Sequence, residues 1–148
     1  MRCLVTGGGG FIGSAIVTKL VEQGHNVVVM GRFNRPHCIA GRIVNEVELL
    51  EGDVRDVEAV GAASKYCDNV YHFAGVVDSD IANGLSVDAI ETEILGLKNI
   101  CHCASKFNIK KIIYGSSCAV YGDDKQEQAL TEESFVRPKS HYAILKRT

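Results

Sequence analysis

The feature that most constrains the fold is a glycine-rich segment, Gly7 to Gly10, followed by Gly13. An apolar run at residues 2–6 precedes it and reads as a strand. After it, apolar residues recur at helical spacing: Ile12, Ile16 and Leu20. Glycines spaced three apart suit a tight turn, a close backbone approach to a pyrophosphate and close packing of helix on strand. Because a helix N-terminus holds phosphate charge, the segment predicts a dinucleotide-binding turn rather than a merely flexible one.

The rest of the chain alternates short apolar runs with helical periods, which is typical of a parallel sheet covered on both faces. We expect strands at residues 2–6, 26–30, 47–50, 70–74 and 109–116. We expect helices from residue 12 to near Gly24, at 57–66, along 86–107 and from 140 onward, with irregular segments at 32–46 and 123–137. The long helix carries one expected apolar stripe: Ile90, Ile94, Leu97, Cys101 and Ala104. The prediction is an α/β, doubly wound parallel sheet (Rossmann fold) in order 3-2-1-4-5, with residues 1–148 as one NAD(P)-binding domain.

Composition narrows the function classes. Of 148 residues, 46% are apolar and 23% charged, and the net charge is -2. This balance gives no electrostatic basis for binding nucleic acid or an anionic membrane. No apolar run approaches the ~20 residues that span a bilayer, and no secretory signal is visible, so we expect a cytoplasmic protein.

Six cysteines raise the question of disulfides or a metal. Cys101 and Cys103 lie two apart on a helix and point to different faces, which suits a metal poorly. Cys3 and Cys118 lie in or beside predicted buried strands, where cysteine acts as a small hydrophobe. We expect reduced, structural cysteines and no metal.

Thr6 to Gly13, with Phe11 and Ile12, resembles the T-G-x-x-G-F-I-G motif of the extended short-chain dehydrogenases/reductases of the NAD-dependent epimerase/dehydratase type. The resemblance runs from residue 2 to residue 147 but covers only the N-terminal part of a typical member. We therefore expect the C-terminal substrate part to be absent. The resemblance implies that the cofactor contacts Gly7, Gly10, Phe11, Ile12 and Gly13.

The end of the second strand bears on the choice of cofactor. NAD-binding folds usually place an acidic residue there to bind the adenosine ribose. Between Glu22 and Glu46 this chain has none, but it has Arg32 and Arg35. Guanidinium groups bind a 2′-phosphate well, so these residues favour NADP(H), with NAD(H) as the alternative. Arg42 is equally well explained as a solvated loop residue.

Two further segments resemble cofactor-lining motifs of the same family. Gly52 to Asp56 matches its G-D-x-x-D segment, which implies that Asp53 and Val54 approach the adenine. The fourth expected strand ends at Ala74, and by the resemblance Ala74, Gly75 and Val76 line the cofactor. His72 within that strand reads as a core histidine without chemistry.

Tyr142 and Lys146 stand four residues apart, on one face of an expected helix. An ammonium group lowers the pKa of a neighbouring phenol, ordinarily about 10, towards the range useful for proton transfer. Tyr121 and Lys125 show the same spacing, but the residues between them read as a turn. The resemblance implies that Lys146 also holds the nicotinamide ribose.

Residues 116–122 resemble the family's S-S-x-x-V-Y-G segment. The resemblance implies that Ser117 holds the substrate oxygen, and Ser116 reads as structural. In the long helix, Gly96 and Asn99 fit the family pattern, but Glu93 stands where an asparagine is usual. A carboxylate cannot donate the hydrogen bonds of an amide, so we expect an altered connection between this helix and the active site.

The resemblance implies oxidation and reduction of a nucleotide-sugar carbon, as in an epimerase or dehydratase, with Ser117, Tyr142 and Lys146 as the catalytic set. A small-molecule substrate, a nucleotide sugar, is the expected partner; a homodimer of the full-length protein is left open. Two alternatives stand beside this reading. One is an NADPH-dependent carbonyl reductase or 3β-hydroxysteroid dehydrogenase, and the other is a truncated, non-catalytic dinucleotide-binding module. We expect the 148-residue chain alone to show little or no turnover.

Overall fold

Five parallel strands form one sheet in the order β3-β2-β1-β4-β5. The computed structural model describes residues 1–33, 38–39, 41–76, 86–122 and 129–147. The strands are β1 (Arg2–Thr6), β2 (Asn26–Gly31), β3 (Val47–Glu51), β4 (Asn69–His72) and β5 (Lys111–Tyr114). The predicted strand order and doubly wound architecture are confirmed. Thr6 pairs with both Met30 and His72, so the carboxyl ends of the central strands lie level at one edge.

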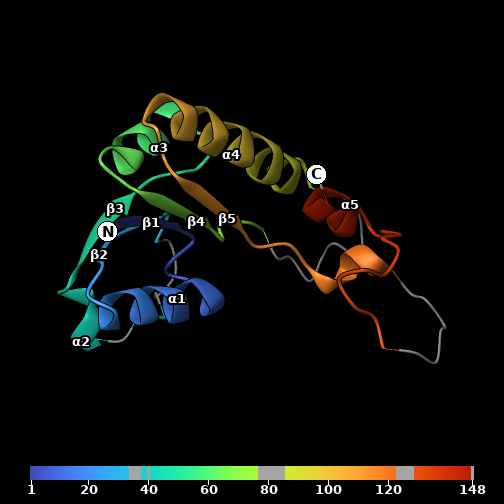
Figure 1. The fold of residues 1–148 in the computed structure, drawn as a ribbon. Helices are drawn as coiled ribbons and strands as arrows, with labels where there is room; N and C mark the ends of the chain where they lie inside the picture. The colour runs from blue at the N-terminus through green and yellow to red at the C-terminus, as the bar shows by residue number, and fades with distance from the viewer. Residues whose placement is uncertain (34–37, 40, 77–85, 123–128, 148) are drawn as a thin grey trace.

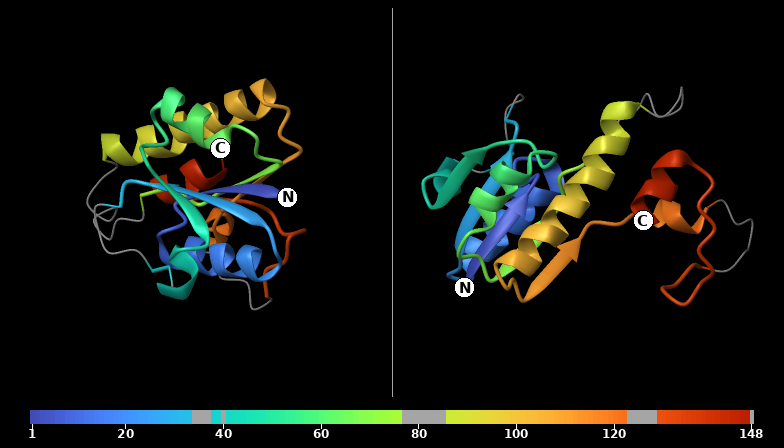
Figure 2. Two further views of the ribbon diagram at one scale, coloured as in Figure 1. Left: turned by 90° about the vertical axis from the view of Figure 1, so that its left-hand side faces the viewer. Right: turned by 90° about the horizontal axis from the view of Figure 1, so that it is seen from above.

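Helices cover both faces of the sheet. They are α1 (Phe11–Glu22), α2 (Gly41–Val44), α3 (Val57–Ser64), α4 (Val87–Lys106) and α5 (His141–Arg147). Figures 1 and 2 show α1 and α2 on one face and α3 and α4 on the other. In Figure 1, α5 and the 3-10 helix η2 (Cys118–Tyr121) lie beyond the carboxyl end of β5.

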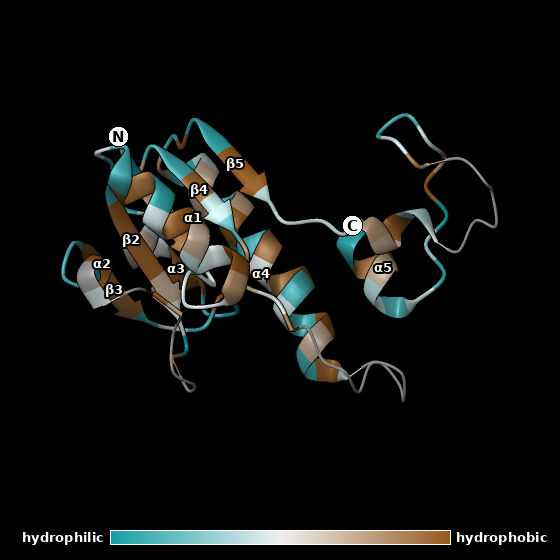
Figure 3. Cartoon of the chain, turned by 90° about the horizontal axis from the view of Figure 1, so that it is seen from below, coloured by the Kyte–Doolittle hydropathy of each residue, from teal (hydrophilic) through white to brown (hydrophobic). Residues whose placement is uncertain are grey.

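Two apolar clusters, one on each face, form the core. Leu4, Val28 and Val70 pack towards α3 and α4, whereas Val5, Val27 and Val29 pack towards α1. Consecutive residues of β1 and β2 are thus buried on opposite faces, as a doubly covered strand requires. Figure 3 shows the apolar stretch along β2. Complete burial of each such side chain stabilises the fold by roughly 1.5–3 kcal/mol.

The buried faces of the two longest helices differ from the predicted stripes. In α1 the buried residues are Gly13, Ser14, Val17 and Leu20, and Ile12 is 60% exposed. In α4 they are Ala89, Thr92, Glu93, Gly96, Ile100, Cys103 and Ala104. The apolar stripe expected on α4 was wrong except at Ala104, because the buried face is displaced around the helix and consists of Ile100, smaller residues and the Glu93 carboxylate.

Other differences concern residues 32–46, the ends of two strands and one cysteine. Residues 32–46 were expected to be irregular, yet Ile39 and Ile43 are buried in the core beneath α1. β4 and β5 end two residues earlier than expected, since β1 ends at Thr6, β4 ends at its partner His72, and β5 ends at Tyr114, the partner of His72. Of the six cysteines, all free thiols, Cys118 is exposed rather than packed beside a strand.

Candidate functional site

The glycine turn after β1 lies at the carboxyl edge of the sheet. Gly7 has φ +68°, and a Cβ there would lie 2.5 Å from the backbone nitrogen of Ala74. A Cβ on Gly13 would collide with the carbonyl oxygen of Gly7. Side chains at these positions would push the turn away from β4 and from α1. The turn is therefore compact because these two residues are glycine.

The same turn leads directly into the first turn of α1. Gly10 is the N-cap residue, is exposed and has no side chain to bind the free N–H groups of that turn. Phe11 is 88% exposed and Ile12 is 60% exposed. An uncapped, exposed helix N-terminus beside a glycine turn is suited to accept phosphate oxygens.

Beneath the turn, Thr6 and His72 connect β1 with β4. Thr6 Oγ1 lies 2.6 Å from His72 Nδ1 and also accepts a 3.4 Å hydrogen bond from the Ala74 N–H. Burial, and secondarily the charge of Lys146, lower the pKa of His72 to about 4. The histidine is thus a neutral core residue, as the sequence indicated.

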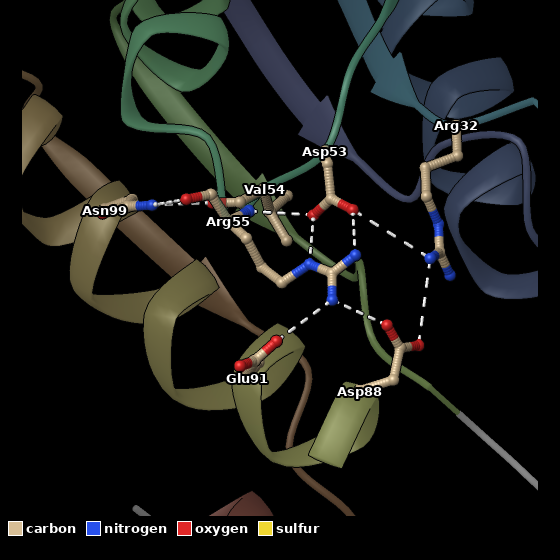
Figure 4. Close-up of polar contacts among 7 residues, drawn as sticks. All are labelled: Arg32, Asp53, Val54, Arg55, Asp88, Glu91 and Asn99. Atoms are coloured by element: carbon tan, nitrogen blue, oxygen red, sulfur yellow. Dashed lines mark hydrogen bonds and ion pairs between the residues drawn. The ribbon is translucent and has the colours of Figure 1, made fainter. Parts of the chain in front are cut away.

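A cluster of charges follows β3. We define the surface cluster as Arg32, Asp53, Arg55, Asp88 and Glu91 (Figure 4). Arg55 donates to both carboxylate oxygens of Asp53, at 3.0 and 2.7 Å, and at 2.7 Å to Asp88. Hydrogen bonding from Arg55 is the largest cause of the lowered pKa of Asp53, and bonding to Asp53 raises the pKa of Arg55.

The segment that carries Asp53 is anchored to α4. The Asn99 amide donates to the carbonyl oxygens of Val54 (3.0 Å) and Arg55 (2.8 Å). A Cβ on Gly96 would lie 2.8 Å from a Val54 methyl group. Two residues that the sequence singled out only as a motif therefore have a structural role in holding this loop. The Val54 side chain is 5% exposed and belongs to the core.

Arg32 occupies the outer end of the surface cluster. Its Nη1 atom lies 4.0 Å from Asp53 and 3.9 Å from Asp88. The sequence argument for a phosphate site depended on the lack of acidic residues in the neighbouring chain, but folding brings two carboxylates to Arg32. The second arginine of that argument, Arg35, lies outside the described residues.

A second group of charges is buried between α4, α5 and β5. We define the buried cluster as Glu93, Lys146 and Tyr114. Glu93 Oε2 accepts hydrogen bonds from Lys146 Nζ at 2.8 Å and from the Tyr114 hydroxyl at 3.1 Å. The Lys146 and Glu93 side chains are only 7% and 2% exposed. Burial, then the charge of Glu93, raise the pKa of Tyr114, so its hydroxyl remains a donor at neutral pH.

Gly75 closes the buried cluster on the side of the glycine turn. A Cβ on Gly75 would collide with Glu93 Oε1 and lie 3.2 Å from Lys146 Nζ. Oε1 itself is buried, and none of the described residues forms a hydrogen bond with it. The exposed residue Gly75 thus lies directly against the Glu93 carboxylate, and only a residue without a side chain fits there.

The predicted catalytic residues lie on neighbouring elements. Lys146 Nζ is 5.9 Å from the centre of the Tyr142 ring, so the two residues share one side of α5 as expected. Ser117 is the N-cap of η2, and its Oγ accepts from the Ala119 N–H at 3.2 Å. The Ser116 hydroxyl donates to the carbonyl oxygen of Lys146 at 3.0 Å, which is a structural role. An open pocket of about 400 Å³ is lined in part by Tyr114, Ser116 and Lys146.

Several residues at this edge were not found from the sequence. Asp88 and Glu91 contact Arg55 from the first turns of α4, more than thirty residues away. Of these residues, only Arg55 could have been suspected from the sequence, because it lies two residues after Asp53. The sequence indicated only that Tyr114 is a strand residue, because its role depends on the position of Glu93 in the folded chain.

The described residues contain neither a metal centre nor a membrane span. Within the described ranges, no three His, Cys, Asp or Glu side chains gather in a way that could hold a metal ion. The helices of that same part of the chain are all too short or too polar to cross a bilayer.

Comparison with known proteins identifies the family. The family model for the NAD dependent epimerase/dehydratase family matches residues 3–148. The chain is 32% identical over 157 residues to UDP-glucose 4-epimerase 3 of Oryza sativa subsp. japonica, covering 97% of this chain and 41% of that protein. It is 30% identical over 125 residues to 3 beta-hydroxysteroid dehydrogenase/Delta 5-->4-isomerase of Mycobacterium tuberculosis, covering 80% and 32%.

The structure is similar to solved ones as well. The crystal structure of UDP-glucose 4-epimerase from Bifidobacterium longum in complex with NAD+ and UDP superposes with a TM-score of 0.86 at 29% identity. The match covers 99% of this chain and 46% of that one, so the chain spans less than half the length of these relatives. The chain belongs to the NAD dependent epimerase/dehydratase family.

Proposed function

We propose that this chain binds a nicotinamide dinucleotide at the carboxyl edge of its sheet. The observation that carries the proposal is the turn formed by Gly7, Gly10 and Gly13, which brings exposed backbone to the uncapped N-terminus of α1. Gly10, Phe11 and Ile12 would hold the pyrophosphate. Asp53 and Val54 would lie near the adenine, and Ala74, Gly75 and Val76 would line the nicotinamide half.

In the whole protein, we propose that the reaction is oxidation and reduction at a carbon of a nucleotide sugar. When bound, the cofactor supplies hydride transfer. Tyr142 exchanges the proton of the substrate hydroxyl, and Ser117 binds the substrate oxygen. Lys146 stabilises the charged form of Tyr142 and holds the nicotinamide ribose. The named relative UDP-glucose 4-epimerase 3, at 32% identity, supports a nucleotide sugar as the substrate class.

A dehydrogenase acting on a hydroxysteroid is the second candidate, because a relative with that name is 30% identical. The two candidates differ in their use of the cofactor. An epimerase returns its hydride to the substrate and consumes no cofactor, whereas a dehydrogenase changes the oxidation state of one cofactor molecule per turnover. Absorbance of the reduced nicotinamide, followed with the whole protein, separates them.

A cytoplasmic location and a homodimer stay predictions.

The choice between NADP(H) and NAD(H) turns on Arg32. The sequence favours NADP(H) through Arg32 and Arg35. The surface cluster, however, has three carboxylates and two guanidinium groups, so a 2′-phosphate would meet a site of net negative charge. This balance supports NAD(H) binding at least as tight as NADP(H) binding. Replacing Asp88 by asparagine removes one carboxylate and should shift the preference towards NADPH.

The proposal is tested by titrating the chain with NADH and NADPH while following nicotinamide fluorescence. Among the described residues, a Cβ on Gly10 would meet only the Gly7 carbonyl oxygen, at 3.3 Å, so Gly10→Ala should fold but obstruct the pyrophosphate. We expect this variant to lose at least about tenfold in affinity, as obstruction of a close backbone approach requires. Gly41→Ala is the matched control, since a Cβ there has no atom within 4 Å. Binding that is absent in the unmodified chain, or unchanged in Gly10→Ala, would refute the proposed site.

A further inference from the structure

Glu93 is the charged residue of the buried cluster to which neither the reaction nor the cofactor assigns a role. It lies on α4, opposite the end of β5, and its carboxylate is buried with one oxygen bound by Lys146 and Tyr114. A buried carboxylate is retained only where it is paired, since an isolated charge is strongly disfavoured away from water. Its position therefore depends on Lys146, and the position of Lys146 depends on it.

Lys146 has no other carboxylate within ion-pair distance among the described residues. Its Nζ atom lies 5.1 Å from the centre of the Tyr114 ring and 5.9 Å from that of Tyr142, so aromatic rings surround the rest of the ammonium group. A lysine side chain has four flexible bonds and would otherwise extend into water. Glu93 is what keeps the ammonium group beneath Gly75.

Gly75 supplies the space that this arrangement needs. Any side chain at position 75 would collide with Glu93 Oε1 and come within 3.2 Å of Lys146 Nζ. Residues 75, 93 and 146 therefore form a matched set: the carboxylate fits only because residue 75 is glycine, and the ammonium group is held only because residue 93 is a carboxylate.

We infer that Glu93 is a positioning residue that fixes Lys146 at the edge of β4 for contact with the second ribose of the dinucleotide. The inference rests on the proposed function, in which Lys146 binds that ribose. Glu93 acts through Lys146, because its side chain is only 2% exposed and its Oε2 atom is bound to the ammonium group.

The experiment compares two ligands, one without and one with that ribose, whose attachment also removes one ionisable oxygen from the terminal phosphate. ADP carries the adenosine and pyrophosphate, and ADP-ribose adds the second ribose. Calorimetric titration of the unmodified chain should give tighter binding of ADP-ribose than of ADP. Glu93→Gln keeps the shape of the side chain but removes its charge, and should weaken ADP-ribose binding about tenfold while leaving ADP binding unchanged, the size of one lost charge-assisted hydrogen bond.

Gly75→Ala should show the same selective loss, because the added methyl group displaces the carboxylate. The control for this variant is Gly61→Ala, where the nearest atom to a Cβ is the Cys103 sulfur at 3.9 Å. Thr92→Val is the control for Glu93→Gln. Thr92 lies next to Glu93 on α4, and its substitution removes a buried hydroxyl that forms no hydrogen bond with any described residue. Both controls should bind ADP and ADP-ribose as the unmodified chain does.

The outcomes separate the inference from the proposed function. If the unmodified chain binds neither ligand, the proposed function fails and the inference fails with it. If it binds ADP but the ratio of the two affinities is the same in Glu93→Gln as in the unmodified chain, only the inference is overturned. Equal weakening of both ligands by Glu93→Gln would likewise overturn it, because this would show a general structural role. A nitrogen-15 NMR signal of the Lys146 ammonium group, sharp in the unmodified chain and lost in Glu93→Gln, gives the same answer without any ligand.

Discussion

Two clusters of acidic and basic side chains lie at the same edge of the sheet, yet they differ in burial and in the number of partners that each charge has. In the buried cluster, the side chains of the Glu93–Lys146 ion pair are 2% and 7% exposed. In the surface cluster the side chains are 27–47% exposed, and every charge except that of Glu91 has at least two partners. Water can replace a lost partner in the surface cluster, whereas the buried pair is almost closed to water. Ion pairs of similar residue types thus contribute differently to the free energy of unfolding, depending on whether the fold buries or exposes them.

The largest expected effect comes from breaking the buried pair. Lys146→Met leaves the Glu93 carboxylate buried and unpaired, which should lower the free energy of unfolding by about 3–5 kcal/mol. Urea denaturation followed by circular dichroism measures this loss. The double variant Glu93→Gln with Lys146→Met has no buried charge and should recover most of the stability. A loss below about 1 kcal/mol in Lys146→Met would show that the pair is solvated after all.

The next effect concerns pH and His72, whose low pKa is due first to burial and then to the charge of Lys146. The folded state keeps His72 neutral down to pH about 4, whereas the unfolded chain protonates it near pH 6.5. Between these values the unfolded state binds more protons, so stability falls as the pH falls. The free energy of unfolding keeps its full value, as far as His72 is concerned, above pH about 6.5. It is lower by roughly 3 kcal/mol at pH 4.

Urea denaturation at a series of pH values measures this loss. His72→Gln should flatten the stability curve between pH 4 and 6.5, although it also removes the contact with Thr6. An unmodified chain that is equally stable at pH 4.5 and pH 7 would contradict the assignment of His72 as a neutral core residue.

The smallest expected effect comes from the surface cluster. Asp88→Asn removes a carboxylate whose side chain is 47% exposed and leaves Arg55 bound to Asp53. We expect a loss of at most about 1 kcal/mol, and less in high salt because exposed charges are screened. Thermal melts at low and high sodium chloride concentration test this, with Glu93→Gln as the comparison whose loss should not depend on salt. A salt-independent loss for Asp88→Asn would remove the distinction between the two clusters.

The sequence predicted the sheet and its order well, because strand periodicity and the glycine turn are local signals. It was less successful with the helix faces. On α4 the stripe containing Ile94 and Cys101 was favoured on hydrophobicity, whereas the residues that face the sheet include Gly96 and Glu93. Gly96 is there because Val54 leaves no space for a side chain, a fact that depends on a loop more than forty residues away.

The charged contacts of the site were harder to predict for the same reason. Arg32 looked free of carboxylates along the chain, but Asp53 and Asp88 reach it from two other elements. Glu93 was recognised as unusual from its position in a motif, yet nothing in the sequence indicated that Tyr114 would bind it. Tertiary contacts between distant residues decide these environments, and a single sequence does not encode them in any local pattern.

The position of β1 at the centre of the sheet affects the order in which the strands can pair while the chain is being synthesised. β1 pairs with β2 on one side and with β4 on the other, and Thr6 meets His72 only across 66 positions of the sequence. On a ribosome that adds roughly 5–20 residues per second, the strands up to Glu51 can associate on the order of one second before β4 has been synthesised. We expect the nascent chain to pass through a three-stranded stage with one open β1 edge, a stage at which a chaperone or a neighbouring nascent chain could pair with it.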